Sequence, residues 1–368
     1  MKTPPPALPG SYLVLETTGL CNLACVHCDR SAVPRPDRDE HAHGGPFLDL
    51  DLALALLEDL GRVGARFDTL ILFWLGEPLL HPHFPSLYPA LLRANARHHT
   101  FGKIEVHTNA LALGPTIAAA ALNEADTPQV WHLTLDAVHR DTYRQVKGRD
   151  ALPEVEAHVE QLIARKAALG AVWPRLVLQF IVSDRNVDEV ETFRARWTRS
   201  LERAGLRVIV AAGQVPPGPG DEAVLFLRQL DCPTHDEQLR QNAVFRGAAT
   251  AMGLTLPTEE EAPVIATNLA PCSGPWKSPV VHWNGDLTVC TRDSGLAMRL
   301  GNLHRQPFSA LWWGPEAEAR RVRIATGDYS GLPLCERCFI PQSANYTGIT
   351  REEIARHAAW AAVRGDTP

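Results

Sequence analysis

Short apolar runs alternate with amphipathic stretches over the first two thirds of the chain. The runs have the length and composition of β-strands, and the stretches between them repeat apolar residues at helical spacing. This alternation predicts an α/β fold in which parallel strands are joined by helices in right-handed crossovers. The predicted strands are 12–17, 69–75, 103–108, 130–135, 175–182 and 207–211, and the predicted helices are 49–63, 84–96, 115–123, 152–169 and 187–204.

Several predicted strands carry polar side chains at every second position, unlike parallel strands that helices cover on both faces. Examples are Glu105 and His107 on the third strand and His132 and Thr134 on the fourth. Residues two apart share a face, so one face of the sheet is polar. We interpret this face as the lining of a reaction chamber in which the histidines bind substrate hydroxyls or a phosphate. The alternative is a hydrogen-bonded polar core layer with satisfied core histidines.

The pattern changes after residue 213. Residues 214–220 (QVPPGPG) are typical of a linker, and residues 221–252 are expected to be helical. From Pro271 onward turn formers, tryptophans and cysteines cluster, and Asn284-Gly285-Asp286 predicts a hairpin over 280–289. We divide the chain into an N-terminal tail (1–10), a barrel (11–213), a linker or bridging helical segment (214–270), a small cysteine-bearing domain (271–345) and a C-terminal helix (346–368).

Composition and charge exclude some classes of partner. The chain has 36 Lys and Arg against 42 Asp and Glu, so its net charge of -6 does not suit a general nucleic-acid binder. No apolar run approaches the roughly 20 residues that span a bilayer, and the first ten residues lack the apolar stretch of a signal peptide. We therefore expect a cytoplasmic protein with neither a nucleic-acid nor a membrane partner.

The eight cysteines carry most of the chemical information, because cytosolic cysteines at short fixed spacings are more often metal ligands or catalytic groups than disulfides. Cys21, Cys25 and Cys28 directly follow the first predicted strand. Three thiolates can hold three irons of a [4Fe–4S] cube and leave the fourth iron open for a cofactor. The alternative is a zinc site completed by His27 or a distant cysteine. The position at the carboxyl end of a barrel strand, where active sites are built, favours the cluster.

A second cysteine group lies near the C-terminus. Cys272, Cys290, Cys335 and Cys338 can saturate one [4Fe–4S] cube and leave no iron open. A structural zinc ribbon has the same number of ligands and is the alternative.

At these residues a family resemblance emerges. The CNLACVHC loop resembles that of the radical S-adenosylmethionine (SAM) enzymes, especially the branch with an extra C-terminal iron–sulfur domain. Leu75-Gly76-Glu77-Pro78 is similar to the GE motif of this family, and Thr134-Leu135-Asp136 resembles its SLD element with Thr in place of Ser. The resemblance covers about residues 11–345. It implies a partial (β/α)6 TIM-like barrel followed by a small C-terminal domain with a β-hairpin and a helix.

The resemblance also implies where SAM binds. His27 stands where the family usually has an aromatic residue beside the adenine. The GE motif holds the methionyl amine, and the SLD element lies near the ribose and the carboxylate. The residues expected to bind SAM are His27, Gly76, Glu77, Pro78, Asn109, Thr134 and Asp136.

The second cysteine group resembles an auxiliary-cluster module. Gly285 precedes Cys290 at the G-x4-C spacing of that module, and no cysteine follows Cys338. The sequence is therefore similar to the reduced, single-cluster "twitch" version of the SPASM domain. This implies a second, auxiliary [4Fe–4S] cluster that serves in electron transfer or shapes the chamber wall.

The family mechanism follows from the resemblance. The reduced first cluster passes an electron to SAM, whose cleavage gives methionine and a 5′-deoxyadenosyl radical that abstracts a hydrogen atom from a substrate C–H bond. A flavodoxin- or ferredoxin-type protein is the expected electron donor.

The remaining thiol bears on the fate of the substrate radical. A weak S–H bond at Cys232 would quench the radical from the opposite face and give an epimer, although a buried thiol is also often just a small hydrophobe. In the oxidative alternative a base removes a proton and the auxiliary cluster accepts an electron. Arg292 and Asp293, directly after Cys290, are candidates for the base or a substrate clamp, and a solvated turn is the plainer interpretation.

The substrate class rests on the same resemblance. Relatives with this module act on ribosomal peptides, protein side chains, or sugars and aminocyclitols of antibiotics. Only about ten residues precede the first strand, so we expect no leader-peptide-binding domain, and a polar chamber suits a small polyol. We predict a carbohydrate epimerase of natural-product biosynthesis. The alternatives are a dehydrogenase of a secondary alcohol, a peptide or protein side-chain maturase, and a non-catalytic, zinc-stapled binding protein.

Overall fold

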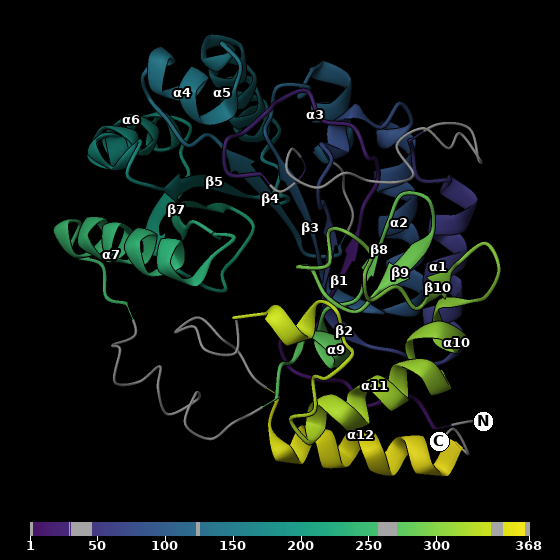
Figure 1. Cartoon of the computed structure of the whole chain (residues 1–368). Coiled ribbons are helices and arrows are strands. Elements are labelled where there is room, and N and C mark those ends of the chain that lie inside the picture. Colours follow the sequence, from purple (N-terminus) through teal and green to yellow (C-terminus); the bar gives the residue numbers. More distant parts are fainter. Residues whose placement is uncertain are drawn as a thin grey trace.

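The computed structural model describes residues 3–28, 30, 46–122, 126–256, 271–339 and 349–364. Within them a single twisted sheet has the strand order β10-β9-β8-β1-β2-β3-β4-β5-β7-β6 (Figure 1). All neighbouring strands from β8 through β1 to β6 are parallel. The six predicted strands are confirmed. The barrel strands are β1 (Tyr12–Leu15), β2 (Phe67–Leu72), β3 (Phe101–Thr108), β4 (Gln129–Thr134), β5 (Arg175–Val182), β6 (Arg207–Ala212) and β7 (Glu222–Gln229).

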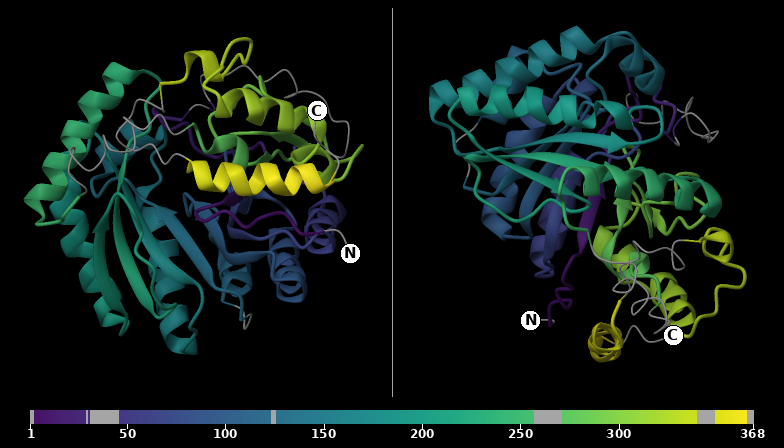
Figure 2. Two further views of the ribbon diagram at one scale, coloured as in Figure 1. Left: turned by 90° about the horizontal axis from the view of Figure 1, so that it is seen from below. Right: turned by 90° about the vertical axis from the view of Figure 1, so that its left-hand side faces the viewer.

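Helices cover the outer face of the curved sheet (Figure 2). Alternate apolar residues of the strands, such as Leu70 and Leu72 on β2, enter the main core beneath these helices, whereas Ile71 between them faces inward. The helices are α1 (Leu50–Arg62), α2 (Phe84–His98), α3 (Pro115–Ala121), α4 (Arg140–Lys147), α5 (Leu152–Leu169), α6 (Val190–Arg203) and α7 (His235–Ala251), with 3-10 turns η2 (Pro78–Leu80), η3 (Val187–Glu189) and η4 (Cys335–Arg337). The short α4 was not predicted.

The helix expected over 221–252 is wrong in its first part. Residues 222–229 form β7, which inserts between β5 and β6 and pairs with both. Its apolar run is buried on both faces, and such a run fits a buried helix or a buried strand equally well by periodicity. The barrel sheet therefore continues past residue 213 into the segment 214–270, which was expected to be a linker or bridging helical segment. As a consequence, Cys232 lies just after the carboxyl end of a barrel strand.

The C-terminal region extends the same sheet. The predicted hairpin is confirmed: β8 (Val280–Val281) and β9 (Asp286–Thr288) are antiparallel, and β8 pairs in parallel with β1. β10 (Gly301–Asn302) completes the edge. The remaining helices are α9 (Gly274–Lys277), α10 (Phe308–Trp312), α11 (Pro315–Ala325) and α12 (Arg351–Arg364). None of the helices in the described ranges is long and apolar enough to cross a membrane.

Candidate functional site

The loop that carries Cys21, Cys25 and Cys28 follows β1 and is anchored to the ends of two other elements. The backbone N–H of Glu77, after β2, donates to the carbonyl of Leu20 at 2.7 Å, just before the first cysteine. On the other side the loop meets the end of α4, where the N–H of Ala24 donates to the carbonyl of Lys147 at 3.1 Å. The loop conformation is thus fixed by the barrel.

Gly76 explains why the motif after β2 needs a glycine. A Cβ atom placed on it would lie 1.8 Å from the carbonyl oxygen of Thr18 and 2.9 Å from that of Leu20. Both contacts are with backbone, which cannot move aside without displacing the cysteine loop. Pro78 then starts the 3-10 turn η2.

Glu77 joins the ends of β2 and β3. Its buried carboxylate accepts hydrogen bonds from the Thr108 hydroxyl at 2.6 Å and from the backbone N–H groups of Asn109 at 2.8 Å and Leu79 at 3.1 Å. Burial raises the pKa of Glu77 to about 7. In this position Glu77 braces the strand ends, and its contact with a methionyl amine stays a prediction.

Asn109 connects β3 to the cysteine loop. Its side-chain amide donates to Asn22 Oδ1 at 2.8 Å and lies 3.9 Å from Cys21 Sγ. A residue expected to touch SAM therefore also orients the first cysteine.

Asp136, after β4, is fully buried and has a left-handed backbone with φ of 60°. Its carboxylate forms an ion pair with the Lys147 ammonium at 2.5 Å and accepts a hydrogen bond from the N–H of Ile181 at 2.7 Å. The same ammonium lies 3.5 Å from the Thr134 hydroxyl. Although burial lowers the pKa of Lys147, the charges of Asp136 and Cys25 outweigh it and raise this pKa.

Lys147 was not among the predicted site residues because α4 itself was not predicted. The one available signal was a lysine near the carboxyl end of a short amphipathic segment, where basic residues are common. Burial raises the pKa of Cys25 to about 11, and the positive charge of the Lys147 ammonium beside it offsets part of this rise. His27, in the same loop, is half-buried, and burial lowers its pKa to about 4.

The second cysteine group also comes together. The sulfur atoms of Cys290 and Cys272 lie 3.5 and 3.6 Å from the position that a Cβ atom of Gly274 would take. Cys335 and Cys338 are close enough to Cys272 and Cys290 for their charges to influence one another. Burial raises the pKa of Cys272 to about 11 and that of Cys290 to about 12.

Two of the three catalytic candidates meet. Cys232 is buried, with 3% of its surface exposed, and its carbonyl accepts a hydrogen bond from Arg292 Nη2 at 3.2 Å. The Asp293 carboxylate is buried within its own loop, where it accepts from the Thr288 hydroxyl and from the N–H groups of Ala297 and Met298. This geometry favours a role for Asp293 in holding the loop rather than as a base.

Comparison with known families identifies the arrangement. The model of the radical SAM superfamily matches residues 15–193, and that of SPASM, an iron–sulfur cluster-binding domain, matches residues 272–339. The chain belongs to the radical SAM superfamily. The matches confirm the resemblance, the partial-barrel fold, and the expected cofactors, SAM and [4Fe–4S] clusters.

Two curated relatives differ in how much of their length aligns with this chain. GTP 3′,8-cyclase of Chlorobaculum tepidum is 28% identical over 182 residues, which are 50% of this chain and 48% of the cyclase, so the alignment spans about half of each. The tungsten-containing aldehyde ferredoxin oxidoreductase cofactor-modifying protein of Pyrococcus furiosus is 20% identical over 366 residues, covering 92% of this chain and 90% of that protein.

Solved structures support the fold. Streptococcus suis SuiB bound to S-adenosylmethionine has a TM-score of 0.55 at 13% identity, over 87% of this chain and 68% of SuiB. At this identity the likeness bears on architecture alone.

The two cysteine groups of this chain have donor sets that fit iron–sulfur clusters. Three thiolates from one loop can bind three irons of a cube and leave the fourth iron open, and four thiolates can saturate a cube. Cys21, Cys25 and Cys28 would hold the SAM-binding cluster, and the four later cysteines the auxiliary one.

The polar residues predicted for one sheet face do share it. His107 and His132 stack with ring centroids 4.0 Å apart, and His132 Nδ1 lies 3.3 Å from Gln179 Oε1. Burial lowers the pKa of His132 to about 3. The strand register pairs Arg228 of β7 with Ile181, two residues after Gln179, so Arg228 belongs to the same face. Arg228 was not predicted to lie on this face because β7 was not predicted.

Proposed function

We propose that this radical SAM enzyme epimerises a carbon centre of a small polar substrate, a carbohydrate or an aminocyclitol of a natural product. Cys232 is the proposed hydrogen-atom donor. The observation that carries this proposal is the position of Cys232 after β7, at the same sheet edge as the cysteine loop after β1. Active sites of parallel barrels are built at this edge.

The state of the thiol supports this role. Burial raises the pKa of Cys232 to about 11, so the S–H bond is retained at neutral pH. A hydrogen-atom donor must carry that hydrogen, whereas a nucleophilic cysteine needs a lowered pKa. The hydrogen bond from Arg292 to the Cys232 carbonyl fixes the backbone that carries the thiol.

The chain's own residues prepare the reaction. When bound, SAM and the reduced cluster supply the radical that removes a hydrogen atom from the substrate. The Asp136–Lys147 pair and Glu77 hold the strand ends around that site. The polar face of β3 to β5 offers acceptors and donors for substrate hydroxyls. We propose a flavodoxin- or ferredoxin-type protein as the electron donor.

Replacing the proposed donor tests the assignment. Cys232→Ala, assayed with a panel of aminocyclitol glycosides in heavy water, should still form 5′-deoxyadenosine but no epimer. The wild type should place one solvent deuterium at the inverted carbon. A Cys232→Ala enzyme that retains epimer formation, or a wild-type product without deuterium, would refute Cys232 as the donor.

Side-chain maturation of a peptide is the second candidate. SuiB bound to the precursor peptide SuiA shares the architecture with a TM-score of 0.55 at 13% identity. In an oxidative reaction of this kind, or in the dehydrogenation of an alcohol, the four-cysteine cluster would accept an electron. Cys232→Ala should then leave product formation unchanged, which separates this candidate from the epimerase.

A further inference from the structure

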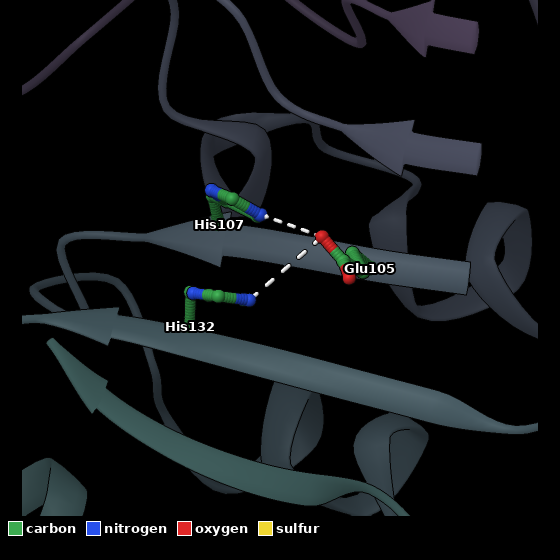
Figure 3. A group of neighbouring side chains, drawn as sticks. All are labelled: Glu105, His107 and His132. Atoms are coloured by element: carbon green, nitrogen blue, oxygen red, sulfur yellow. Dashed lines mark hydrogen bonds and ion pairs between the residues drawn. The ribbon is translucent and has the colours of Figure 1, made fainter. Parts of the chain in front are cut away.

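Three ligand-type side chains converge on the inner face of the barrel, apart from both cysteine groups. Glu105 and His107 lie on β3 and His132 on β4, where the register pairs it with His107 (Figure 3). Glu105 Oε2 is 3.1 Å from His107 Nε2 and 3.7 Å from His132 Nε2. Among the His, Cys, Asp and Glu side chains of the described residues, this is the group of three with ligand atoms all within 4.8 Å of one another.

The proton positions leave room for a cation between these atoms. His132 Nδ1 faces Gln179 Oε1, an acceptor, so Nδ1 carries the ring proton. The Nε2 lone pair of His132 then points toward Glu105 Oε2 across 3.7 Å, too far for a hydrogen bond. Glu105 and His132 are 9% and 5% exposed. A buried lone pair that faces a carboxylate is unfavourable without a positive charge between them.

The surrounding residues orient each of the three groups. Lys103 Nζ lies 2.7 Å from Glu105 Oε1, which leaves Oε2 to face the histidines. Gln179 fixes the tautomer of His132, and Phe73 stacks on His107 with ring centroids 5.3 Å apart. Metal-binding histidines and carboxylates in proteins are oriented by such outer partners. A polar core layer without a metal does not need its histidines and carboxylate to converge on one point.

We propose that Glu105, His107 and His132 bind one divalent first-row transition-metal ion. Two imidazoles and a carboxylate are the ligands of catalytic zinc sites and of non-haem iron sites, and both leave coordination positions open. On binding, the metal takes the place of the proton between His107 Nε2 and Glu105, and this proton moves to Nδ1 of the same ring, so that the bound imidazole is neutral. A hydroxyl of a polar substrate is the ligand that the open position would take. Metal binding itself does not depend on whether the enzyme is an epimerase.

X-ray absorption on the wild-type enzyme tests the proposal. The enzyme with both clusters reconstituted is dialysed against micromolar zinc chloride, and iron, sulfide and zinc are measured on the same sample. We expect about one zinc per chain with nitrogen and oxygen neighbours only, at about 2.0–2.1 Å, including imidazole. Absence of bound zinc, or zinc with sulfur neighbours at about 2.3 Å, would overturn the site, because the second result places the metal at the cysteines.

Variants locate the metal. His107→Ala and Glu105→Gln should lose the zinc while iron content stays unchanged, which also shows that the barrel is folded. Gln179→Leu, which removes an outer partner, should weaken zinc binding by about 10- to 100-fold. His139→Ala removes an exposed histidine and is the matched control. Zinc binding that survives both ligand variants would place it elsewhere on the chain.

Discussion

Arg292 of the SPASM domain donates a hydrogen bond across 3.2 Å to the carbonyl of Cys232, which follows the barrel strand β7. The guanidinium also lies 5.2 Å from the centroid of the Phe339 ring, and the N–H of Arg292 lies 3.4 Å from Cys290 Sγ. One residue thus connects a proposed auxiliary-cluster ligand to the proposed hydrogen donor.

Arg292 is therefore predicted to act as a positioning residue. Arg292→Ala should lower the ratio of epimer to 5′-deoxyadenosine by about 10- to 100-fold, because the thiol loses its fixed position while SAM cleavage continues. Product analysis on the same turnover sample gives this ratio. The exposed Arg305 of the same domain provides the control, Arg305→Ala, which should leave it unchanged. An equal ratio in Arg292→Ala and wild type would contradict the positioning role.

The two cysteine groups are predicted to hold separate clusters. Wild-type enzyme should contain about eight irons and eight sulfides per chain when purified anaerobically. Cys25→Ala and Cys290→Ala should each retain about four, and only Cys25→Ala should abolish SAM cleavage outright. Iron analysis combined with electron paramagnetic resonance checks both statements. About four irons and one zinc in the wild type would instead make the C-terminal site structural.

Gly76 is predicted to be irreplaceable even by alanine. The added methyl group would meet the Thr18 carbonyl at 1.8 Å, so the cysteine loop must shift and its iron content should fall. Gly247→Ala in α7 is the control, since a Cβ there meets nothing within 4 Å. Iron per chain and melting temperature separate a local loss of the cluster from general unfolding. A Gly76→Ala enzyme with full iron content would refute the role assigned to this contact.

Breaking the buried ion pair of Asp136 and Lys147 should destabilise the fold. Lys147→Met leaves an unpaired buried carboxylate, and we expect a loss of about 3–5 kcal/mol in the free energy of unfolding. The exposed pair of Arg140 and Asp150 gives the comparison, and Arg140→Met should lower the free energy of unfolding far less, because water screens an exposed ion pair. Urea denaturation of the apoprotein measures both. Similar losses in the free energy of unfolding for the two variants would mean that the burial of Lys147 does not strengthen its contribution to stability.

The docking of α12 on α11 should depend on pH. Burial by itself raises the pKa of Glu318, but the hydrogen bond from His357 and the charge of Arg321 outweigh it and lower this pKa. A carboxyl with a lowered pKa stabilises the fold above its unfolded pKa of about 4.3 and loses this effect as the pH falls. The stability difference between wild type and Glu318→Gln should therefore shrink below about pH 4. A difference that stays constant across this range would contradict the prediction.

The cysteine spacings and the alternation of strands and helices were enough to predict the barrel, both cysteine sites and the hairpin of the C-terminal domain. These features are local, because a C-x3-C-x2-C loop and a turn at Asn284-Gly285 are each defined by residues only a few positions apart in the sequence. The alternation of Glu105 with His107 likewise indicated which residues share a face.

Contacts between distant segments were decided by the tertiary structure. The run 222–229 became a strand because β5 and β6 satisfy its backbone hydrogen bonds on both sides, and this placed Cys232 at the carboxyl edge of the parallel strands. Strand register brought His132 against Glu105, and the sheet pairing of β8 with β1 carried Arg292 to Cys232. Periodicity fixes which face a residue occupies, but only the packing of the whole chain fixes which residue it meets there.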